Sequence, residues 1–375
     1  MRYNLRKGSI MRHYIYQLAK WPLFNWDQEK IANQLANIHQ RQGQLIGLMK
    51  ALGFTIQKET VLQMLTLDVT QSSLIEGETL NTVEVRSSIA RRLGIPLAQY
   101  VKSSRHVEGI VGMIMDATQN FAKPLTIERI LQWQIDLLSS DINHIYTRIG
   151  AWRDDAQGPM QVISGAISRE KIHFEAPSAD VLEKELQSFF TWTEQNNTDL
   201  VLKAAIAHLW FVTLHPFEDG NGRIARAISD YFLAKSEQSS QRFYSMSAQM
   251  RVERKGYYAI LESTQKGDLN ITQYLEWFLS CLLHAIENTE QIVKLILFKK
   301  QFWEQYQGLE INVRQKLMLN KLLDGFKGKL TTSKWSKIAK CSQDTALRDI
   351  QQLIHLGILI KDPAGGRSTS YSLKI

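Results

Sequence analysis

The sequence predicts a mainly α-helical protein with two short β-hairpins, one in the middle of the chain and one at its C-terminal end. Apolar residues recur at helical spacing near the N-terminus, at Ile31, Leu35, Ile38 and Leu45, and again in the last part of the chain. Runs of β-forming residues are short and lie beside glycines. We therefore expect helices to form most of the core, with the hairpins as small additions.

Length and cysteine usage favour a multidomain cytoplasmic protein. The chain has 375 residues, more than one ordinary domain. Its two cysteines, Cys281 and Cys341, cannot make a disulfide framework and lie in no Cys/His cluster, which argues against secretion and structural zinc. The N-terminus is polar, and no apolar run reaches transmembrane length. We expect no membrane contact.

The stretch HPFEDGNGRIAR, His215 to Arg226, has the residue types of a polyphosphate site. Gly220, Asn221 and Gly222 allow backbone N–H groups to turn inward around an anion. The residues from Arg223 onward are predicted to begin a helix, whose N-terminus attracts anions. Arg223 and Arg226 share one helical face and could both bind phosphate oxygens.

Two further residues of this stretch supply chemistry. Asp219 is a hard oxygen ligand suited to Mg²⁺, which takes one or two protein carboxylates and obtains its other ligands from phosphate and water. His215 lies outside the phosphate cradle and is free to act as a base. Phe217 has no catalytic chemistry and is expected to anchor the loop in the core.

The stretch resembles, position for position, the Fic motif HxFx(D/E)GNGRxxR. The resemblance implies AMP transfer from ATP to a hydroxyl side chain of a protein, with Mg²⁺ as cofactor and His215 as the base. It also implies that Asn221 and the glycines hold the α-phosphate, and that Arg223 and Arg226 hold the outer phosphates. Residues 1–100, which Trp21-Pro22 and Trp26-Asp27 open, resemble the helical domain found ahead of bacterial Fic cores.

A second motif lies upstream, in Ser72 to Gly77. It resembles the inhibitory motif (S/T)xxxE(G/N) of the Fic family, in which a helix places a glutamate against the active site. A carboxylate of Glu76 paired with Arg226 would remove that guanidinium from the γ-phosphate. We therefore expect autoinhibition by Glu76, while an ordinary exposed helix glutamate is the alternative.

A β-hairpin is predicted between these two motifs. Its strands are the run that starts Gln161, Val162, Ile163 and the run Lys171 to Glu175, with Gly165 near the turn. The Fic family has its flap here, which is implied to bind a target segment as an added strand. A solvent-exposed hairpin without a partner is the alternative.

Downstream of the motif, Tyr258, Leu261 and Gln265 share one face of a predicted helix. The segment resembles the part of Fic proteins that encloses adenine, and plain core packing is the alternative. His208 is expected to be a core histidine without a functional role.

The C-terminal tail has its own charge and pattern. Residues 311–375 contain 12 Lys/Arg and 4 Asp/Glu, a net charge of +8 that equals that of the whole chain. Helices are predicted over Arg314 to Phe326, Ser333 to Ala339, and from the N-cap Ser342 to Gly357. Two short strands around a Gly-rich turn follow, which makes a winged helix-turn-helix.

Such a module can place its third helix in the major groove of DNA. Gln343, Asp344, Thr345 and Arg348 would then face the nucleic acid. Winged helices also serve as dimerisation or protein-docking modules, so both partners remain open.

The expected domains are residues 1–100, the catalytic core 101–298 and the winged helix 299–375, with Lys299 to Asn312 as the best candidate linker. The preferred function is a protein adenylyltransferase that modifies Ser, Thr or Tyr hydroxyls of a target or of itself, in a homodimer. Two alternatives remain. The same site could remove AMP from a modified protein, or a nucleotide-sensing core could control a DNA-binding regulator.

Overall fold

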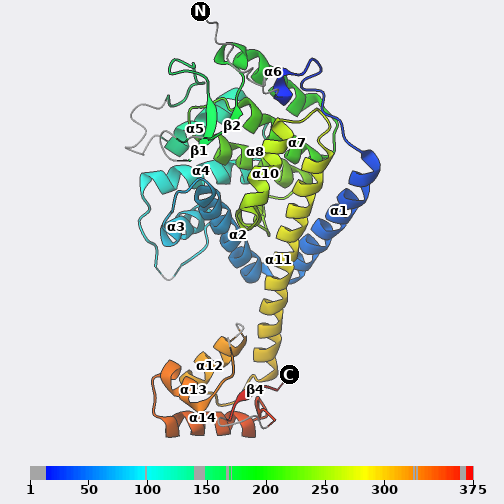
Figure 1. Ribbon diagram of the computed structural model, residues 1–375. Coiled ribbons are helices and arrows are strands. Elements are labelled where there is room, and N and C mark those ends of the chain that lie inside the picture. The colour runs from blue at the N-terminus through cyan, green and yellow to red at the C-terminus, as the bar shows by residue number, and fades with distance from the viewer. Residues whose placement is uncertain are drawn as a thin grey trace, which may run out of the picture. The chain divides into compact units, whose positions relative to one another are not determined.

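The computed structural model describes most of the chain. The described residues are 14–97, 99–138, 148–165, 169, 171–323, 326, 328–363 and 369–374. Helices predominate among them, which confirms the mainly α-helical class (Figure 1). Two small antiparallel sheets of two strands each are also present in the described residues.

The chain divides into two compact units, Met1–Thr289 and Glu290–Ile375. The boundary falls inside helix α11, Thr272–Gln305. The domain boundaries at residues 100 and 298 stay predictions. The candidate linker begins at Lys299, but its residues as far as Gln305 are part of helix α11. Residues 14–97 belong to the same unit as the Fic-like motif.

The first unit is built from helices with one inserted hairpin. Its elements before α11 are the 3₁₀ turn Ile15–Gln17, α1 Gln28–Ala51, α2 Phe54–Ile75, α3 Thr82–Arg92, α4 Arg105–Gln119, α5 Ile127–Leu138, β1 Gln161–Ser164, β2 Lys171–Glu175, α6 Ala179–Gln195, α7 Leu200–Leu214, α8 Asn221–Glu237, α9 Met246–Val252 and α10 Arg254–Gln265.

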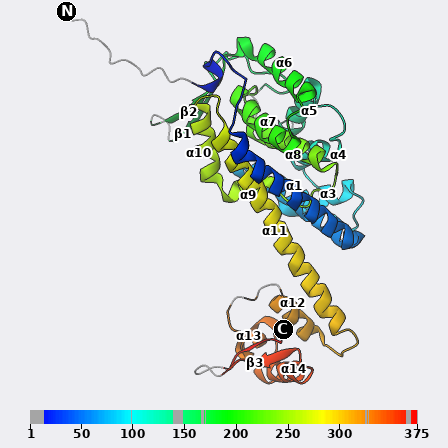
Figure 2. The same ribbon diagram turned by 90° about the vertical axis from the view of Figure 1, so that its right-hand side faces the viewer.

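Helices α7 and α8 form the centre of this unit and lie side by side in both views (Figures 1 and 2). Helix α7 is apolar on all faces, and nearly every one of its residues is buried. Its N-terminus is capped by Asp199, whose carboxylate accepts a hydrogen bond from the backbone N–H of Val201 at 2.9 Å. The motif His215 to Arg226 therefore begins at the buried end of a central helix.

Helix α2 is fixed against the core by a buried polar contact with α9. The carboxylate of Asp68, in α2, accepts hydrogen bonds from the Ser245 hydroxyl at 2.5 Å and from the Ser247 backbone N–H at 3.2 Å. Asp68 is fully buried, and these bonds to its Oδ1 offset part of the cost of burying the carboxylate. They hold the helix that ends in the inhibitory motif.

Strands β1 and β2 form the hairpin expected between the two motifs. They are antiparallel, with Ile163 opposite Ile172 and Val162 opposite Phe174. His173 is thus the extra residue of a β-bulge on β2. Bulges redirect side chains and are frequent beside active sites. In both views the hairpin lies beside α10 (Figures 1 and 2).

The second unit contains the remaining elements. They are the C-terminal part of α11, α12 Val313–Leu323, α13 Thr332–Ala339, α14 Gln343–His355, β3 Leu359–Lys361 and β4 Tyr371–Leu373. Ser342 caps α14 as expected, with its hydroxyl accepting from the Thr345 N–H at 3.1 Å. Helix α12 was expected to reach Phe326 but ends at Leu323. Part of the predicted Gly-rich turn lies outside the described residues.

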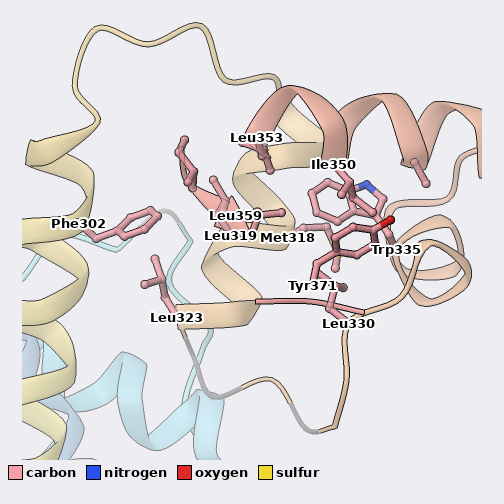
Figure 3. Close-up of a cluster of buried hydrophobic side chains, with 12 residues drawn as sticks. Phe302, Met318, Leu319, Leu323, Leu330, Trp335, Ile350, Leu353, Leu359 and Tyr371 are labelled. Atoms are coloured by element: carbon pink, nitrogen blue, oxygen red, sulfur yellow. The ribbon is translucent and has the colours of Figure 1, made fainter. Parts of the chain in front are cut away.

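A separate hydrophobic core holds this second unit together. Trp335, Ile350 and Tyr371, from α13, α14 and β4, meet there with Met318 and Leu319 of α12 (Figure 3). All five are buried. Because the two strands contribute to the same core as the helices, the tail is one small domain of helices and a hairpin.

Within the described residues, we find no helix that combines the length and the apolar character needed to cross a membrane.

Candidate functional site

His215 ends helix α7 in a strained backbone conformation. Its φ of 47° and ψ of 55° are left-handed, a conformation that costs a non-glycine residue energy and is concentrated at functional sites. Its Nδ1 lies 3.2 Å from the Val212 carbonyl oxygen and donates to it. The proton is thereby held on Nδ1, and Nε2 keeps a lone pair that can accept a proton.

The surroundings keep this imidazole neutral. Burial, together with the positive charge of Arg153, lowers the pKa of His215 to about 4, against the hydrogen bond to Val212 and the charges of Glu76 and Asp219. Arg153 is itself buried and donates from Nε to the backbone oxygen of His215 at 2.8 Å. Arg153 therefore both fixes the backbone turn at His215 and favours the neutral imidazole.

Phe217 and Asn221 fix the loop that follows. Phe217 is fully buried and packs against Trp152, with ring centroids 4.8 Å apart. The Asn221 side chain accepts from the Phe217 N–H at 2.9 Å and donates to the Phe217 carbonyl at 2.7 Å. The Asn221 amide thus closes the loop.

The two glycines of the loop are required by its geometry. Gly220 has φ of 90°, and a Cβ there would lie 2.7 Å from Cδ2 of Leu137. A Cβ on Gly222 would lie 2.3 Å from Oε1 of Glu76. A carboxylate of this chain therefore lies against the first turn of α8, where the helix dipole favours an anion.

Glu76 and Arg226 form an ion pair across this first turn. Glu76 Oε1 lies 2.7 Å from Arg226 Nη2, and the guanidinium is almost completely buried, with 2% of its side chain exposed. Arg226 also donates from Nε to the Ser72 hydroxyl at 2.9 Å and from Nη2 to the Ser72 carbonyl at 2.9 Å. The contact expected between the two motifs is present.

Burial alone would lower the pKa of Arg226, but the Glu76 carboxylate outweighs it and raises that pKa above its ordinary value. The Nη1 atom of Arg226 is buried and has no hydrogen-bond partner among the described residues. A buried donor without a partner is costly. The guanidinium can therefore bind a further acceptor, and phosphate oxygens are suited to it.

The end of α2 explains the glycine of the inhibitory motif. The N–H of Glu78 donates to the Ser73 carbonyl at 3.0 Å, and the N–H of Gly77 donates to the Leu74 carbonyl at 3.1 Å. This pair of bonds is a Schellman C-cap, which needs a left-handed residue. Gly77 supplies it with φ of 90°. The turn places Glu76 and Glu78 on either side of Gly77.

Glu78 and His106 are site residues that sequence reasoning missed. Glu78 Oε2 accepts from Nη1 of Arg223 at 2.8 Å, and its other oxygen pairs with the His106 ring. Burial raises the pKa of Glu78, but His106 and Arg223 together lower it below its usual value. Both arginines of the motif are therefore paired with carboxylates from the end of α2. A second carboxylate so near Glu76 was the available sequence signal.

Asp219 is the carboxylate suited to a metal ion. Its side chain is 44% exposed. It accepts from the Gly220 N–H at 2.5 Å and lies 3.5 Å from Arg223 Nη2. The described residues contain no group of three potential metal-binding side chains. One carboxylate beside a phosphate cradle fits Mg²⁺ that arrives with a nucleotide, because such Mg²⁺ obtains most of its ligands from phosphate and water.

Helix α10 places the residues expected at adenine. Leu261 and Gln265 are buried, and Tyr258 is 39% exposed. The Tyr258 hydroxyl donates to the Ile75 carbonyl at 3.3 Å, whereas Gln265 donates to the Thr213 hydroxyl of α7 at 3.3 Å. Tyr258 thus contacts the end of α2, and Gln265 contacts the central helix.

His208 lies in the core, bonded to two tyrosine hydroxyls, Tyr274 at 2.9 Å and Tyr257 at 3.1 Å. Burial lowers its pKa to about 3. It is a structural histidine with satisfied ring nitrogens, in agreement with the sequence interpretation.

Comparison with known proteins identifies the central part of the chain. Residues 124–233 match the sequence model of the Fic/DOC family. The chain contains a Fic domain. Residues 14–95 match a domain of unknown function, DUF4172, and this match includes Ser72 to Gly77. The inhibitory-type motif thus precedes the Fic domain, and its carboxylate contacts that domain's α8 helix.

Curated relatives of the Fic domain are named protein adenylyltransferases. The chain is 27% identical over 201 residues to "Protein adenylyltransferase fic-1" of Caenorhabditis elegans, which covers 52% of this chain and 35% of the relative. It is 24% identical over 234 residues to "Protein adenylyltransferase Fic" of Drosophila melanogaster, covering 60% of this chain and 43% of the relative. The matched part therefore spans less than half the length of these relatives.

A solved structure shares the fold over nearly the whole chain. The crystal structure of a Fic family protein from Desulfovibrio desulfuricans aligns with a TM-score of 0.54 at 17% identity, and covers 93% of this chain and 97% of that chain. At 17% sequence identity, this similarity shows a shared fold only.

Proposed function

We propose that this protein transfers AMP from ATP to a Ser, Thr or Tyr hydroxyl of a protein, including its own chain. The Fic domain and the names of its relatives support this reaction. Within the chain, the observation that carries the proposal is the Glu76 carboxylate, which lies against the first turn of α8. This oxyanion pairs with Arg226 at 2.7 Å beside a helix N-terminus, which is a setting that also suits a phosphate.

Each residue of the motif has a separate role in the proposed reaction. Nε2 of His215 accepts the proton of the attacking hydroxyl, which makes a weak nucleophile reactive. The backbone of Gly220, Asn221 and Gly222 holds the α-phosphate. Arg223 and Arg226 bind the outer phosphates and stabilise the charge that develops on the leaving pyrophosphate. Asp219 would hold Mg²⁺, which supplies further charge neutralisation when bound.

We propose that the end of α2 inhibits this reaction in the same chain. Glu76 pairs with Arg226, and Glu78 pairs with Arg223. Each carboxylate competes with a phosphate for its guanidinium and repels a phosphate that approaches. While both ion pairs are formed, the protein would bind ATP weakly or in an unproductive position. Movement or mutation of the end of α2 would release this inhibition.

The hairpin and α10 are proposed to position the substrates. Main-chain groups of Gln161, Val162 and Ile163 would pair with an extended target segment, so that side-chain specificity stays loose. Leu261, Gln265 and Tyr258 would lie near the adenine. The homodimer, the Mg²⁺ requirement and the cytoplasmic location stay predictions.

We also propose that residues 311–375 bind DNA. Their net charge of +8 supports contact with phosphates. On α14, Gln343, Asp344 and Arg348 are exposed and Thr345 is partly exposed, while the opposite face of the helix is buried in the core of the second unit.

The first prediction tests AMP transfer with labelled ATP. The purified Glu76→Gly chain, incubated with Mg²⁺ and a cell lysate, should add protein label from α-labelled ATP and add none from γ-labelled ATP, each compared with the lysate alone. The wild-type chain should label far less. His215→Ala added to Glu76→Gly should abolish labelling of the lysate proteins, because release of the inhibition cannot replace the base that acts on their hydroxyls. Label from γ-labelled ATP above that of the lysate alone would mean phosphate transfer by this chain instead.

A chase distinguishes removal of AMP from transfer. Proteins labelled by the Glu76→Gly chain are freed of nucleotide and mixed with the wild-type chain. Stable label supports a transferase, whereas loss of label that requires Glu76 would assign the wild-type chain to AMP removal.

A further inference from the structure

Three side chains from three segments form a hydrogen-bonded line at the hairpin. The Ser164 Oγ lies 2.6 Å from Nε2 of His173, and Nδ1 of His173 lies 2.7 Å from Oε2 of Glu262. Glu262 is in α10, and its other oxygen accepts from Lys266 at 2.5 Å. A nucleophile within reach of a base that a third group orients is the arrangement of an activated hydroxyl.

The protonation state of this line is set by Glu262. The hydrogen bond from Lys266, together with that from His173, lowers the pKa of Glu262 to about 2, although burial acts in the opposite direction. An ionised carboxylate can only accept, so Nδ1 of His173 carries the proton. In the neutral imidazole Nε2 is then the acceptor, and the hydrogen bond runs from the Ser164 hydroxyl to His173.

The backbone is shaped to make this contact. His173 is the extra residue of the bulge between the pairs Val162–Phe174 and Ile163–Ile172. In a regular ladder, side chains alternate between faces and each residue has a cross-strand partner. The bulge redirects His173, whose ring reaches across the hairpin to Ser164 and outward to α10.

Ser164 is exposed. A small substrate would gain little burial beside an exposed serine, so this line is poorly suited to a hydrolase with its own substrate pocket. An exposed, activated hydroxyl suits an acceptor of a group that an active site delivers. Glu262 is adjacent in sequence to Leu261, on the helix proposed to lie at the adenine.

We propose that Ser164 is an acceptor for AMP on this chain, with His173 as its base and Glu262 as the group that orients His173. This inference rests on the proposed AMP transfer and names one residue that receives the group. The bond between Ser164 Oγ and the α-phosphorus of ATP forms, the bond from that phosphorus to the bridging oxygen breaks, and pyrophosphate leaves. The hydroxyl proton passes to His173 Nε2 and then to solvent.

The test is peptide mapping by mass spectrometry. The full-length Glu76→Gly chain is incubated with ATP and Mg²⁺ without any target, and the fraction of each serine that carries AMP is measured. We expect AMP on Ser164. Ser263 is the matched control, because it is also exposed and lies beside Glu262, but its hydroxyl donates to a backbone oxygen, the Ile260 carbonyl, at 3.0 Å. Its occupancy should be at least about tenfold lower.

Two variants test the base. His173→Gln and Glu262→Gln, each in the Glu76→Gly chain, should lower the Ser164 occupancy by about tenfold or more relative to other modified residues of the same chain. Normalisation within one chain separates loss of the base from loss of overall activity. Two variants also protect the test against a folding defect in one of them.

The outcomes are separable from those of the proposed function. Labelled lysate proteins together with an unmodified Ser164 would overturn this inference and leave AMP transfer standing. Equal occupancy of Ser164 and Ser263, or occupancy at Ser164 that neither variant changes, would overturn the activation by His173. Failure to label any protein would overturn both.

Discussion

At the scale of single residues, His215 combines strain and charge in one side chain. Its left-handed backbone ends α7 and turns the chain toward the α8 cradle. Burial and Arg153 hold its imidazole neutral, with the pKa lowered to about 4. A base must be unprotonated when the hydroxyl arrives, so this environment prepares it over a wide range of pH.

The pH dependence of transfer follows from that pKa. For an imidazole with the ordinary value of about 6.5, only ~10% would be neutral at about pH 5.5. With its pKa lowered to about 4, His215 stays neutral there, and protonation stops the reaction only as the pH falls toward that value. The transfer rate of the Glu76→Gly chain should therefore change little between about pH 7.5 and pH 5.5.

The measurement is initial rate against pH, with circular dichroism to show that the chain stays folded. The same chain with His215→Ala supplies the background. Loss of half the rate near pH 6.5 would contradict the lowered pKa of His215.

The pair of carboxylates around Gly77 gives the second residue-scale prediction. In the Glu76→Gly chain, Glu78→Gln should raise the affinity for ATP by roughly fivefold, equivalent to ~1 kcal/mol for a partly exposed pair. The physical reason is that Arg223 is then free to bind phosphate. Isothermal titration calorimetry measures the change.

Glu59→Gln is the matched control, because Glu59 is also in α2 and pairs with an arginine, Arg86, at 2.8 Å on the surface. It should leave ATP affinity unaltered. If Glu78→Gln weakens ATP binding, Glu78 supports Arg223 rather than competing for it.

At the scale of elements, the positions of residues along a helix or strand could be predicted from the sequence. The contacts that depend on how a turn or bulge redirects a side chain could not. The helical period places Arg223 and Arg226 on one face of α8, and the hairpin runs were visible as β-forming segments. The approach of Glu76 to Arg226 was expected only through the resemblance to the Fic inhibitory motif. These features need either short-range periodicity or a known motif.

The features that were missed depend on single turns and bulges. The approach of Glu78 to Arg223 follows from the Schellman turn at Gly77, which reverses the chain after α2. The contact of His173 with Glu262 follows from one unpaired residue in β2. The helical continuation of α11 through Lys299 was likewise hidden, since charged, glutamine-rich sequences form linkers and exposed helices alike.

At the scale of the whole molecule, the charge is concentrated in the second unit. The net charge of residues 311–375 equals the +8 of the chain, so the rest of the protein is neutral on balance. Some of the tail's charge has a structural use, as in Arg314, which pairs with Asp349 at 2.8 Å. Lysines such as Lys337 of α13 are exposed and could contact phosphates.

DNA binding by this unit can be tested by measuring how its affinity for DNA depends on salt concentration. Affinity of the full chain for duplex DNA should fall steeply as salt rises, because each phosphate contact releases a counterion. Each Lys→Ala or Arg→Ala change on the docking face, Arg348→Ala among them, should reduce the slope of log affinity against log salt by about one.

Arg314→Ala is a poor probe, since it also breaks the pair with Asp349. Fluorescence anisotropy over a salt series measures the slope. A chain without residues 311–375 that binds duplex as tightly as the full chain would remove this function from the tail, and would leave its helices and hairpin as a protein-docking module.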